Sequence, residues 1–298
     1  MNFLCDILGN IKENLSMFRN DINVSFEFFP PKSVDYVNSN FLNSIEKLSV
    51  FHPKFISITC TANLDSIHDY TAQAIKNIPT RLNLNIAPHI IYVNSNKKKI
   101  QDLARMYWNN GIKNIIALRG DIQKNNTSTQ LYASELILLL KQVADFDISV
   151  AAYPEVHPTC HNSYIDIINL KNKINCGANR AITQFFFNVD HYLRFRDRCF
   201  CVGIDKEIIP GILPITNFQQ IQKFTNMTNV NLPKWICNLF SKIECDEVNI
   251  SKMFGLLICL DMVNQLYKEG IRDFHFYTLN QFDIVYTLCC YLGLSVQK

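Results

Sequence analysis

Short apolar runs alternate with amphipathic segments along most of the chain. In the segment 100–107, apolar side chains recur at positions i, i+3, i+4 and i+7, which predicts the buried face of a helix. The same spacing appears in residues 136–143, and further helices are predicted for residues 246–269 and 282–292. The runs rich in strand-forming residues cover 24–29, 55–60, 84–91, 114–119, 148–153, 181–186, 207–213 and 274–279.

The spacing of these runs predicts the fold class. One run follows the next after about thirty residues, the length of a strand–helix–strand unit. About eight such units in 298 residues predict an α/β fold of the (β/α)8 or TIM barrel type. We expect residues 1–298 to form a single catalytic barrel domain, with an N-terminal helical extension over 1–20 and the barrel over 21–298. The long gap at 230–269 predicts an extra helix before the last strand.

An open doubly wound sheet is the alternative arrangement of such units. That fold usually carries a glycine-rich turn after its first strand, but here the turn is Phe29-Pro30-Pro31. No two of the nine glycines stand two residues apart, so a G-x-G-x-x-G fingerprint is absent. Any nucleotide must therefore be bound without a Rossmann domain.

The composition narrows the class of protein. The chain is 48% hydrophobic and 18% charged, with a formal net charge of +3, as is typical of a globular protein. The lysine run 97–99 begins a predicted helix and does not indicate a nucleic-acid partner. The apolar run 253–260 is too short to span a bilayer, and Asp6 interrupts the apolar start of the chain. We therefore expect a cytoplasmic protein with no membrane partner.

The cysteines predict reduced thiols. There are 11, irregularly spaced and without a C-x-x-C motif. Cys259, Cys289 and Cys290 lie inside apolar runs, where a free thiol acts as a small apolar side chain. Disulfides and a zinc site are therefore not expected.

Polar side chains interrupt the predicted strands at their C-terminal ends, which is where the active sites of α/β barrels lie. Glu27 is the sharpest case, because it alternates with Phe26 and Phe28. A carboxyl group among phenylalanines should be poorly solvated, which raises its pKa and suits a general acid. The alternative is a glutamate on the solvent side of an edge strand.

The fourth predicted strand ends in Arg119, Gly120 and Asp121. The glycine permits a tight turn or the close approach of a ligand. The arginine suits a phosphate or carboxylate, and the aspartate suits a cationic or NH-rich ring. A surface turn with an ion pair is the alternative interpretation.

Other strand ends are polar as well. Gln184 offers both a donor and an acceptor to an amide or pterin edge. Thr59 and His89 are ambiguous, since a single histidine at a strand end is often a structural hydrogen-bonding group. Residues 151–158, Ala-Ala-Tyr-Pro-Glu-Val-His-Pro, form a stiff loop with an aromatic, an acid and a histidine.

Two classes of chemistry are disfavoured. His157, Cys160 and His161 are metal-ligand types, but no fourth ligand lies nearby in the sequence, so no metal is expected. Hydrolytic patterns are absent: there is no nucleophile elbow, and no strand end pairs two carboxylates. The remaining groups suit the binding of flat heterocycles and the delivery of one proton.

Six segments carry a resemblance to a known family. They are residues 24–31 (VSFEFFPP), 117–121 (ALRGD), 151–158 (AAYPEVHP), 177–187 (GANRAITQFFF), 209–214 (IPGILP) and 274–280 (FHFYTLN). In these segments, and in their order, the chain resembles methylenetetrahydrofolate reductase of the bacterial type. The resemblance runs from about residue 20 to the end.

The resemblance implies a barrel that binds FAD non-covalently. It implies the reduction of 5,10-methylenetetrahydrofolate to 5-methyltetrahydrofolate with NADH, which supplies methyl groups for methionine synthesis. NADH reduces the flavin and leaves, and the folate then binds over the same flavin face. Relatives are commonly homotetramers, so a homo-oligomer is implied.

The resemblance also assigns roles by position. Glu27 matches the acid that protonates N10 and opens the imidazolidine ring, and Asp121 matches an aspartate beside flavin and pterin. Positions matching contacts to FAD or nucleotide are Thr59, Cys60, Ala62, His89, Arg119, Gly120, Asp121, Ala133, Tyr153, His157, Cys160, Asp166, Asn169, Asn172 and Lys173. Positions matching contacts to folate or nicotinamide are Asp121, Gln184, Gln220, Phe224 and Gln281.

Three positions depart from the family pattern. Cys60 stands where a tyrosine often contacts flavin, Asn172 where a basic residue often lies near the FAD phosphates or adenosine, and Gln281 where an arginine often assists folate. A lost charge-assisted hydrogen bond typically costs about 1.5–3 kcal/mol. The sequence therefore predicts looser binding with the chemistry retained, and compensation by Lys171 and Lys173.

Two other functions stay open at this point. A flavin-dependent barrel of the proline dehydrogenase kind shares the cofactor arrangement but gives no reason for Glu27. A degenerate barrel kept for binding or assembly is suggested by the three departures, although Glu27, Asp121 and Gln184 are intact. His275 and Tyr277 either pack in the barrel or contact folate, and the choice between NADH and NADPH is open.

Overall fold

The computed structural model of the chain describes residues 21–31, 40–60, 67–92, 96–120, 132–160, 162–243 and 248–294. The predicted extension over residues 1–20 lies outside these ranges. So do three residues named above: Ala62, Asp121 and His161.

Each predicted strand is present, and one of them is divided. The predicted strand at 207–213 appears as two pieces on either side of Pro210, which has no N–H to donate to a ladder. The strands are β1 (Asn23–Phe28), β2 (Ile56–Ile58), β3 (Ile86–Ile91), β4 (Asn114–Leu118), β5 (Asp147–Ala152), β6 (Arg180–Thr183), β7 (Glu207–Ile209), β8 (Gly211–Ile212) and β9 (Asp273–Tyr277).

The divided strand closes the sheet into a barrel. All pairs are parallel, in the order β7-β6-β5-β4-β3-β2-β1-β9-β8. The two ends of this order are consecutive pieces of chain, so β7 pairs with β6 while β8 pairs with β9. Between the two pieces, Pro210 O accepts a hydrogen bond of 3.1 Å from His275 N. The (β/α)8 barrel is thereby confirmed, and the open doubly wound sheet is excluded.

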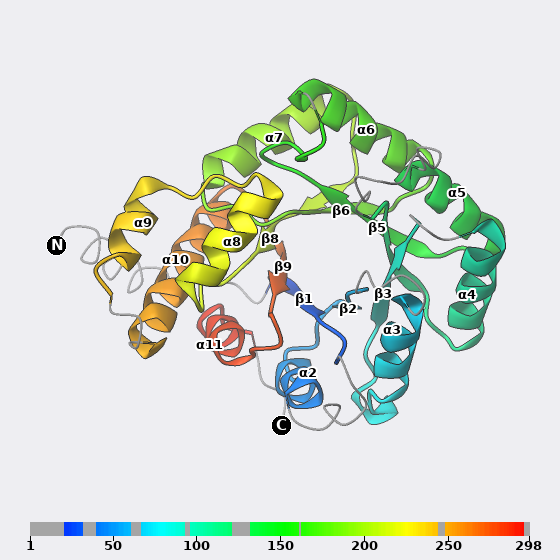
Figure 1. Ribbon diagram of the computed structural model, residues 1–298, viewed down its shortest axis with the longest axis horizontal. Coiled ribbons are helices and arrows are strands. Elements are labelled where there is room, and N and C mark those ends of the chain that lie inside the picture. Colours follow the sequence, from blue (N-terminus) through cyan, green and yellow to red (C-terminus); the bar gives the residue numbers. More distant parts are fainter. Residues whose placement is uncertain are drawn as a thin grey trace.

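Helices surround the barrel (Figure 1). They are α2 (Phe41–Ser49), α3 (Ile67–Lys76), α4 (Lys97–Asn109), α5 (Ala133–Val143), α6 (Ser163–Asn175), α7 (Val189–Cys201), α8 (Phe218–Thr228), α9 (Lys234–Phe240), α10 (Val248–Lys268) and α11 (Asp283–Tyr291), with a 3-10 turn η2 (Thr80–Leu82). The extra helical segment before the last strand is confirmed as α9 and α10. Within the described residues, no helix is both long enough and apolar enough to cross a membrane.

Asparagine side chains fix where four of these helices begin. Asn96, Asn162, Asn188 and Asn217 each accept a hydrogen bond from a backbone N–H in the first turn of the helix that follows. Such caps satisfy donors that have no partner inside the helix. They set the starts of α6 and α8, the helices that carry several predicted site residues.

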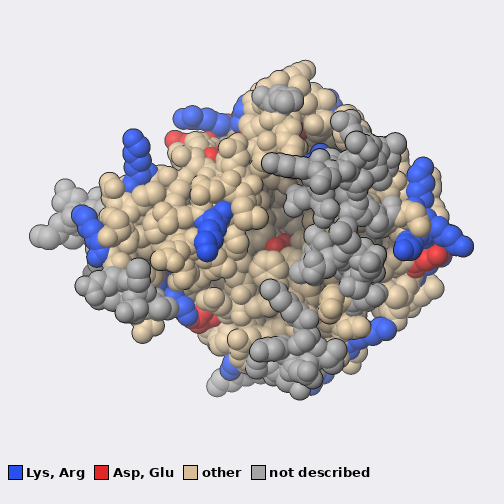
Figure 2. All heavy atoms as spheres, viewed as in Figure 1, with Lys and Arg blue, Asp and Glu red and all other residues tan. Residues whose placement is uncertain are grey.

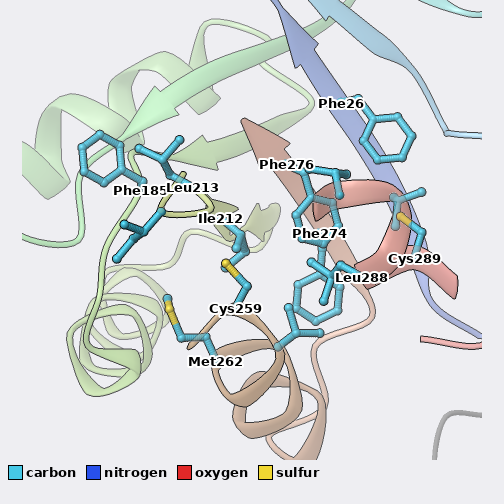
Figure 3. Close-up of a cluster of buried hydrophobic side chains, with 14 of the residues drawn as sticks. Phe26, Phe185, Ile212, Leu213, Cys259, Met262, Phe274, Phe276, Leu288 and Cys289 are labelled. Carbon is cyan, nitrogen blue, oxygen red and sulfur yellow. The ribbon is translucent and has the colours of Figure 1, made fainter. Parts of the chain in front are cut away.

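The outward side chains of the strands pack under the helices. Figure 3 shows one such cluster, in which Phe274 and Phe276 of β9 meet α10 and α11. Cys259 and Cys289 are buried there, which confirms their role as small apolar side chains. Cys290 is exposed, so the same prediction was wrong for that residue: it lies on the solvent side of α11.

Gly211, at the start of β8, has no side chain and so leaves room for the Tyr277 ring where β8 pairs with β9. A methyl group at this position would lie 2.2 Å from Thr183 O and 2.6 Å from the Tyr277 ring. We predict that Gly211→Ala lowers the free energy of unfolding by at least the ~1–3 kcal/mol typical of an overpacked core. Urea unfolding measures this.

The matched control is Gly111→Ala. A methyl group there meets no atom within 4 Å, although the φ of +81° is unfavourable for alanine. Its expected cost is therefore about 1 kcal/mol, from backbone strain alone. Equal losses in the two variants would contradict the packing argument.

Candidate active site

Polar side chains gather at the C-terminal ends of the barrel strands. Glu27 lies near the end of β1 and His89 within β3, while Arg119, Tyr153 and Gln184 directly follow β4, β5 and β6. The face of the molecule drawn in Figure 2 is hollowed near its centre, and acidic atoms are visible within the hollow. The strand ends are therefore the place to look for chemistry, as in other α/β barrels.

Glu27 lies inside the barrel between two imidazoles. Its Oε2 is 3.2 Å from His89 Nε2 and 3.7 Å from His275 Nε2. Ser57 Oγ, on the neighbouring strand, donates to the same oxygen at 3.5 Å. Because β1 pairs with β2 on one side and β9 on the other, the edge-strand alternative is excluded.

His275 contacts this carboxylate from β9, where it is in register with Ser25, two residues before Glu27. Its side chain is 0% exposed, its Nδ1 is 2.8 Å from Ser25 Oγ, and its ring stacks on Phe55 with centroids 5.8 Å apart. A ring enclosed in this way packs inside the barrel and does not line the mouth. Tyr277 also has a structural contact, since its hydroxyl donates to Thr183 O at 2.8 Å across the barrel.

The pKa of Glu27 is the opposite of the one expected from the sequence. Burial raises the pKa, but the attraction of the neighbouring His89 and His275 imidazoles outweighs burial and lowers it to about 2. The expected rise assumed phenylalanine neighbours, but Phe26 and Phe28 belong to the cluster under the helices. The Glu27 side chain is therefore a carboxylate near neutral pH, and it can act as an acid only after it has accepted a proton.

The end of β9 holds the end of β1 in place. Asn280 accepts from Phe29 N and donates to Phe29 O, both at 2.9 Å. Thr278 Oγ1 donates to Glu27 O at 2.6 Å. Leu279 and Asn280 both have positive φ, of 50° and 57°, a conformation that asparagine tolerates better than most residues. This turn fixes the backbone that carries the Glu27 carboxylate.

Two cations lie close together near the ends of β4 and β5. Burial lowers the pKa of Lys173, Asp166 raises it and Arg119 lowers it, with a net value of about 8. Lys173 donates to Ala151 O, and Asp166 accepts from His157 N at 2.9 Å. Two cations whose charges act on each other suit a phosphate group.

Lys171 has a different environment from Lys173. It donates to Val202 O at 2.6 Å, in the contact between α6 and the end of α7. Asn172 between them is exposed, and compensation for it by Lys173 stays a prediction.

A buried hydroxyl follows β2, and a glycine with positive φ follows β4. Thr59 Oγ1 is buried and has no hydrogen-bond partner among the described residues. A buried polar atom of this kind indicates a water molecule or a ligand group. Gly120 has a φ of +86°, a left-handed conformation that favours glycine, and the choice between a tight turn and the close approach of a ligand stays open.

The other predicted positions lie on three helices and in the strand-end loops. Gln220 and Phe224 lie one turn apart on α8, and both are partly buried. Gln184 Oε1 accepts from Phe185 N at 3.1 Å, and Gln281 is exposed directly after Asn280. The remaining positions lie in or beside α5, α6 and β2: Ala133, Asn169, Cys160 and Cys60.

Sequence reasoning missed several residues that build the site. Ser25 could have been found, because it alternates with Glu27 and so shares its face of β1. Ser57 and Asn280 gave no such signal, since their contacts depend on which strands are neighbours. Within the described residues, no three His, Cys, Asp or Glu side chains come close enough to hold a metal ion.

Comparison with known proteins assigns the family. The methylenetetrahydrofolate reductase family model matches residues 11–293. The chain belongs to the methylenetetrahydrofolate reductase family. It is 49% identical over 284 residues to the 5,10-methylenetetrahydrofolate reductase of Escherichia coli K12, covering 95% of each chain. It is 47% identical over 289 residues to that of Buchnera aphidicola subsp. Acyrthosiphon pisum, covering 97% of each.

A solved structure supports the fold. A Clostridium thermocellum protein, described as uncharacterized and binding two copies of 5-methyl-5,6,7,8-tetrahydrofolic acid, aligns with a TM-score of 0.68. The alignment covers 95% of this chain and 98% of that one at 15% identity, so it speaks for the barrel alone. The expected family and enzyme class, an oxidoreductase of the methylenetetrahydrofolate reductase family, are confirmed by the sequence relatives.

The low pKa of Glu27 predicts a pH-dependent contribution to stability. A folded pKa of about 2 against the ordinary 4.5 means that the stabilisation is complete above about pH 4.5 and is lost as pH falls toward 2. The free energy of unfolding of the parent should therefore fall more steeply in this window than that of Glu27→Gln. The difference in slope should approach about 1.4 kcal/mol per pH unit.

Urea unfolding between pH 5 and pH 3 measures the two slopes. Glu46→Gln is the control, since Glu46 forms an exposed ion pair with Arg81 that contributes little. Identical slopes for the parent and Glu27→Gln would show that the carboxylate is not stabilised by its imidazole neighbours.

Proposed function

We propose that this protein reduces 5,10-methylenetetrahydrofolate to 5-methyltetrahydrofolate, using non-covalently bound FAD and NADH as reductant. The observation that carries the proposal is the Glu27 carboxylate, held between His89 and His275 near the C-terminal end of the barrel. A hydride transfer to this substrate also needs one proton, and a carboxylate coupled to imidazoles is suited to deliver one.

The residues at the strand ends fit a flavin dinucleotide. Arg119 and Lys173 would hold its phosphates, because two neighbouring cations match a pyrophosphate. Thr59 offers a buried hydroxyl without a partner in the described chain, and the turn at Gly120 allows a ligand to approach the backbone. When bound, the flavin supplies the hydride chemistry that no amino-acid side chain provides.

The chain itself handles the proton. Because the pKa of Glu27 is low, its carboxylate first accepts a proton from solvent and then donates it to N10 of the folate. Protonation at N10 breaks its bond to the bridging carbon and opens the imidazolidine ring. Glu27 takes up one proton from solvent in each turnover.

Helix α8 supplies the surface for the flat substrates. Phe224 stacks on whichever substrate is present, and Gln220 and Gln184 offer amide groups to its polar edge. Since NADH and folate use this surface in turn, the cycle is ping-pong. The aspartate expected beside the pterin, Asp121, stays a prediction from the sequence, as do the homo-oligomer, the cytoplasmic location and the link to methionine synthesis.

The first test of this function is spectroscopic. We expect the purified protein to be yellow. In the absence of oxygen, NADH should bleach the flavin absorbance, and methylenetetrahydrofolate should restore it. In Glu27→Gln, NADH should bleach the flavin at nearly the parental rate. Folate turnover should fall by about 10²–10⁴-fold, the usual contribution of a general acid.

The outcomes separate the competing functions. A colourless protein that neither takes up FAD nor oxidises NADH would favour the degenerate barrel. A yellow protein that NADH does not reduce, but proline does, would favour the proline dehydrogenase kind. Unchanged folate turnover in Glu27→Gln would remove Glu27 from the reaction.

A second test concerns the missing basic residue at Asn172. This position is exposed on α6, so a restored charge there is screened and worth about 0.2–1 kcal/mol. We expect Asn172→Arg to lower the dissociation constant of FAD by about 1.4- to fivefold. Fluorescence titration of the apoprotein measures it, and Asn109→Arg on α4 controls for added charge. FAD affinity equal to that of the parent would contradict the prediction that Asn172 loosens FAD binding.

A further inference from the structure

Glu155, in the loop after β5, contacts two distant parts of the chain. Its Oε2 accepts a hydrogen bond of 2.7 Å from Asn231 N, just beyond the end of α8. Its Oε1 lies 3.2 Å from His191 Nδ1 on α7. The side chain is only 11% exposed, so these contacts hold a partly desolvated carboxylate in one place. Nothing in the proton chemistry above uses this residue.

Helix α8 is anchored differently at its two ends. At its start, Asn217 caps the helix by accepting from Gln220 N at 2.9 Å. The segment before the cap packs closely on α10, where a methyl group at Gly255 would lie 2.1 Å from Ile215 O. At its end, Asn229 takes a left-handed conformation and the chain turns toward Glu155. The carboxylate thus ties the C-terminal end of α8 to the strand-end loop of the barrel.

The backbone of the loop aims Glu155 at α8. Val156 has a φ of +74°, which is strongly unfavourable for a β-branched side chain. On the next residue, His157 N donates to Asp166 on α6. The loop is therefore held on one side by α6 and on the other by the end of α8, and these contacts maintain the strained turn between them. Strained backbone of this kind concentrates at functional sites.

We propose that Glu155 is a positioning residue that sets the place of α8, and thereby of Phe224 and Gln220, over the mouth of the barrel. This inference rests on the proposed function, in which NADH and folate bind in turn against α8. The same loop contains Tyr153 and His157, which are expected beside the flavin. Glu155 therefore fixes the distance between this loop and helix α8. Loss of the contact between Glu155 and Asn231 should weaken the binding of both NADH and folate and leave proton transfer by Glu27 unchanged.

Three substitutions of Glu155 separate the effect of side-chain length from the effect of its negative charge. Glu155→Gln keeps an oxygen acceptor at the same distance from Asn231 N. Glu155→Asp keeps the charge but is one methylene too short, and Glu155→Ala removes both. We expect the Asp and Ala variants to raise the KM for NADH and for folate about tenfold, the value of one hydrogen bond to a charged group. Glu155→Gln should stay within about threefold of the parent, with kcat and FAD retention nearly unchanged in all three.

Hydrogen exchange gives a readout that needs neither flavin nor activity. The Asn231 amide and the last turn of α8 should exchange faster in the Asp and Ala variants than in the parent, and at the parental rate in Glu155→Gln. Asp283→Ala is the matched control, because it breaks the ion pair with Lys252 between α10 and α11. We expect it to lower the melting temperature and leave both KM values unchanged.

The possible outcomes are distinct. If the Asp and Ala variants melt earlier but keep the parental KM values, Glu155 is merely structural and the proposal fails. If Glu155→Gln is as impaired as Glu155→Ala, the charge facing His191 is decisive and the tie to Asn231 is not. If the Ala variant does not fold, the contrast between the Asp and Gln variants decides. A parent without flavin or NADH oxidation would overturn the proposed function, while the exchange data would still test the tie.

Discussion

A carboxylate inside a parallel barrel is the constraint on which the rest of this structure depends. An ionised glutamate taken out of water is costly unless charged or hydrogen-bonding partners surround it. Here His89 and His275 provide those partners, with Ser57 bonded to the carboxylate and Ser25 to the second imidazole. One side of the barrel interior is therefore polar. An apolar cluster that includes Ile116, Ile182 and Ile209 lies beside it and reaches His275 through Phe55, as expected for buried parallel strands.

The closure of the barrel and the placement of this carboxylate are mechanically linked. Tyr277 is in register with Glu27 on the neighbouring strand, and its hydroxyl reaches across to Thr183. The space taken by its ring is available because residue 211 has no side chain. Directly after β9, Asn280 holds both backbone groups of Phe29. The strand that completes the sheet thus also fixes the end of the strand that carries the acid.

Features that depend on the spacing of neighbouring residues can be predicted from the sequence. Features that depend on contacts between distant strands cannot. Strand positions, the helix before β9 and the location of Glu27 at a strand end follow from periodicity, which is a property of neighbouring residues. The pKa of Glu27 does not, because the groups that decide it come from β3 and β9. The division of the seventh strand at Pro210 depends on which strands lie beside each half. Glu155 accepts a hydrogen bond from the backbone N–H of Asn231, and a contact with a backbone group cannot be predicted from residue types.

Two kinds of support serve two different tasks in this site. Glu27, His89 and His275 lie inside the barrel, where strand pairing, the Tyr277 contact and the Asn280 turn hold the carboxylate in one geometry. The C-terminal end of α8 is held instead by the contact from Glu155 in the loop after β5. Under the proposed function, these two supports keep the acid and the substrate-binding side chains of α8 in place independently of each other, because they are attached to different parts of the fold.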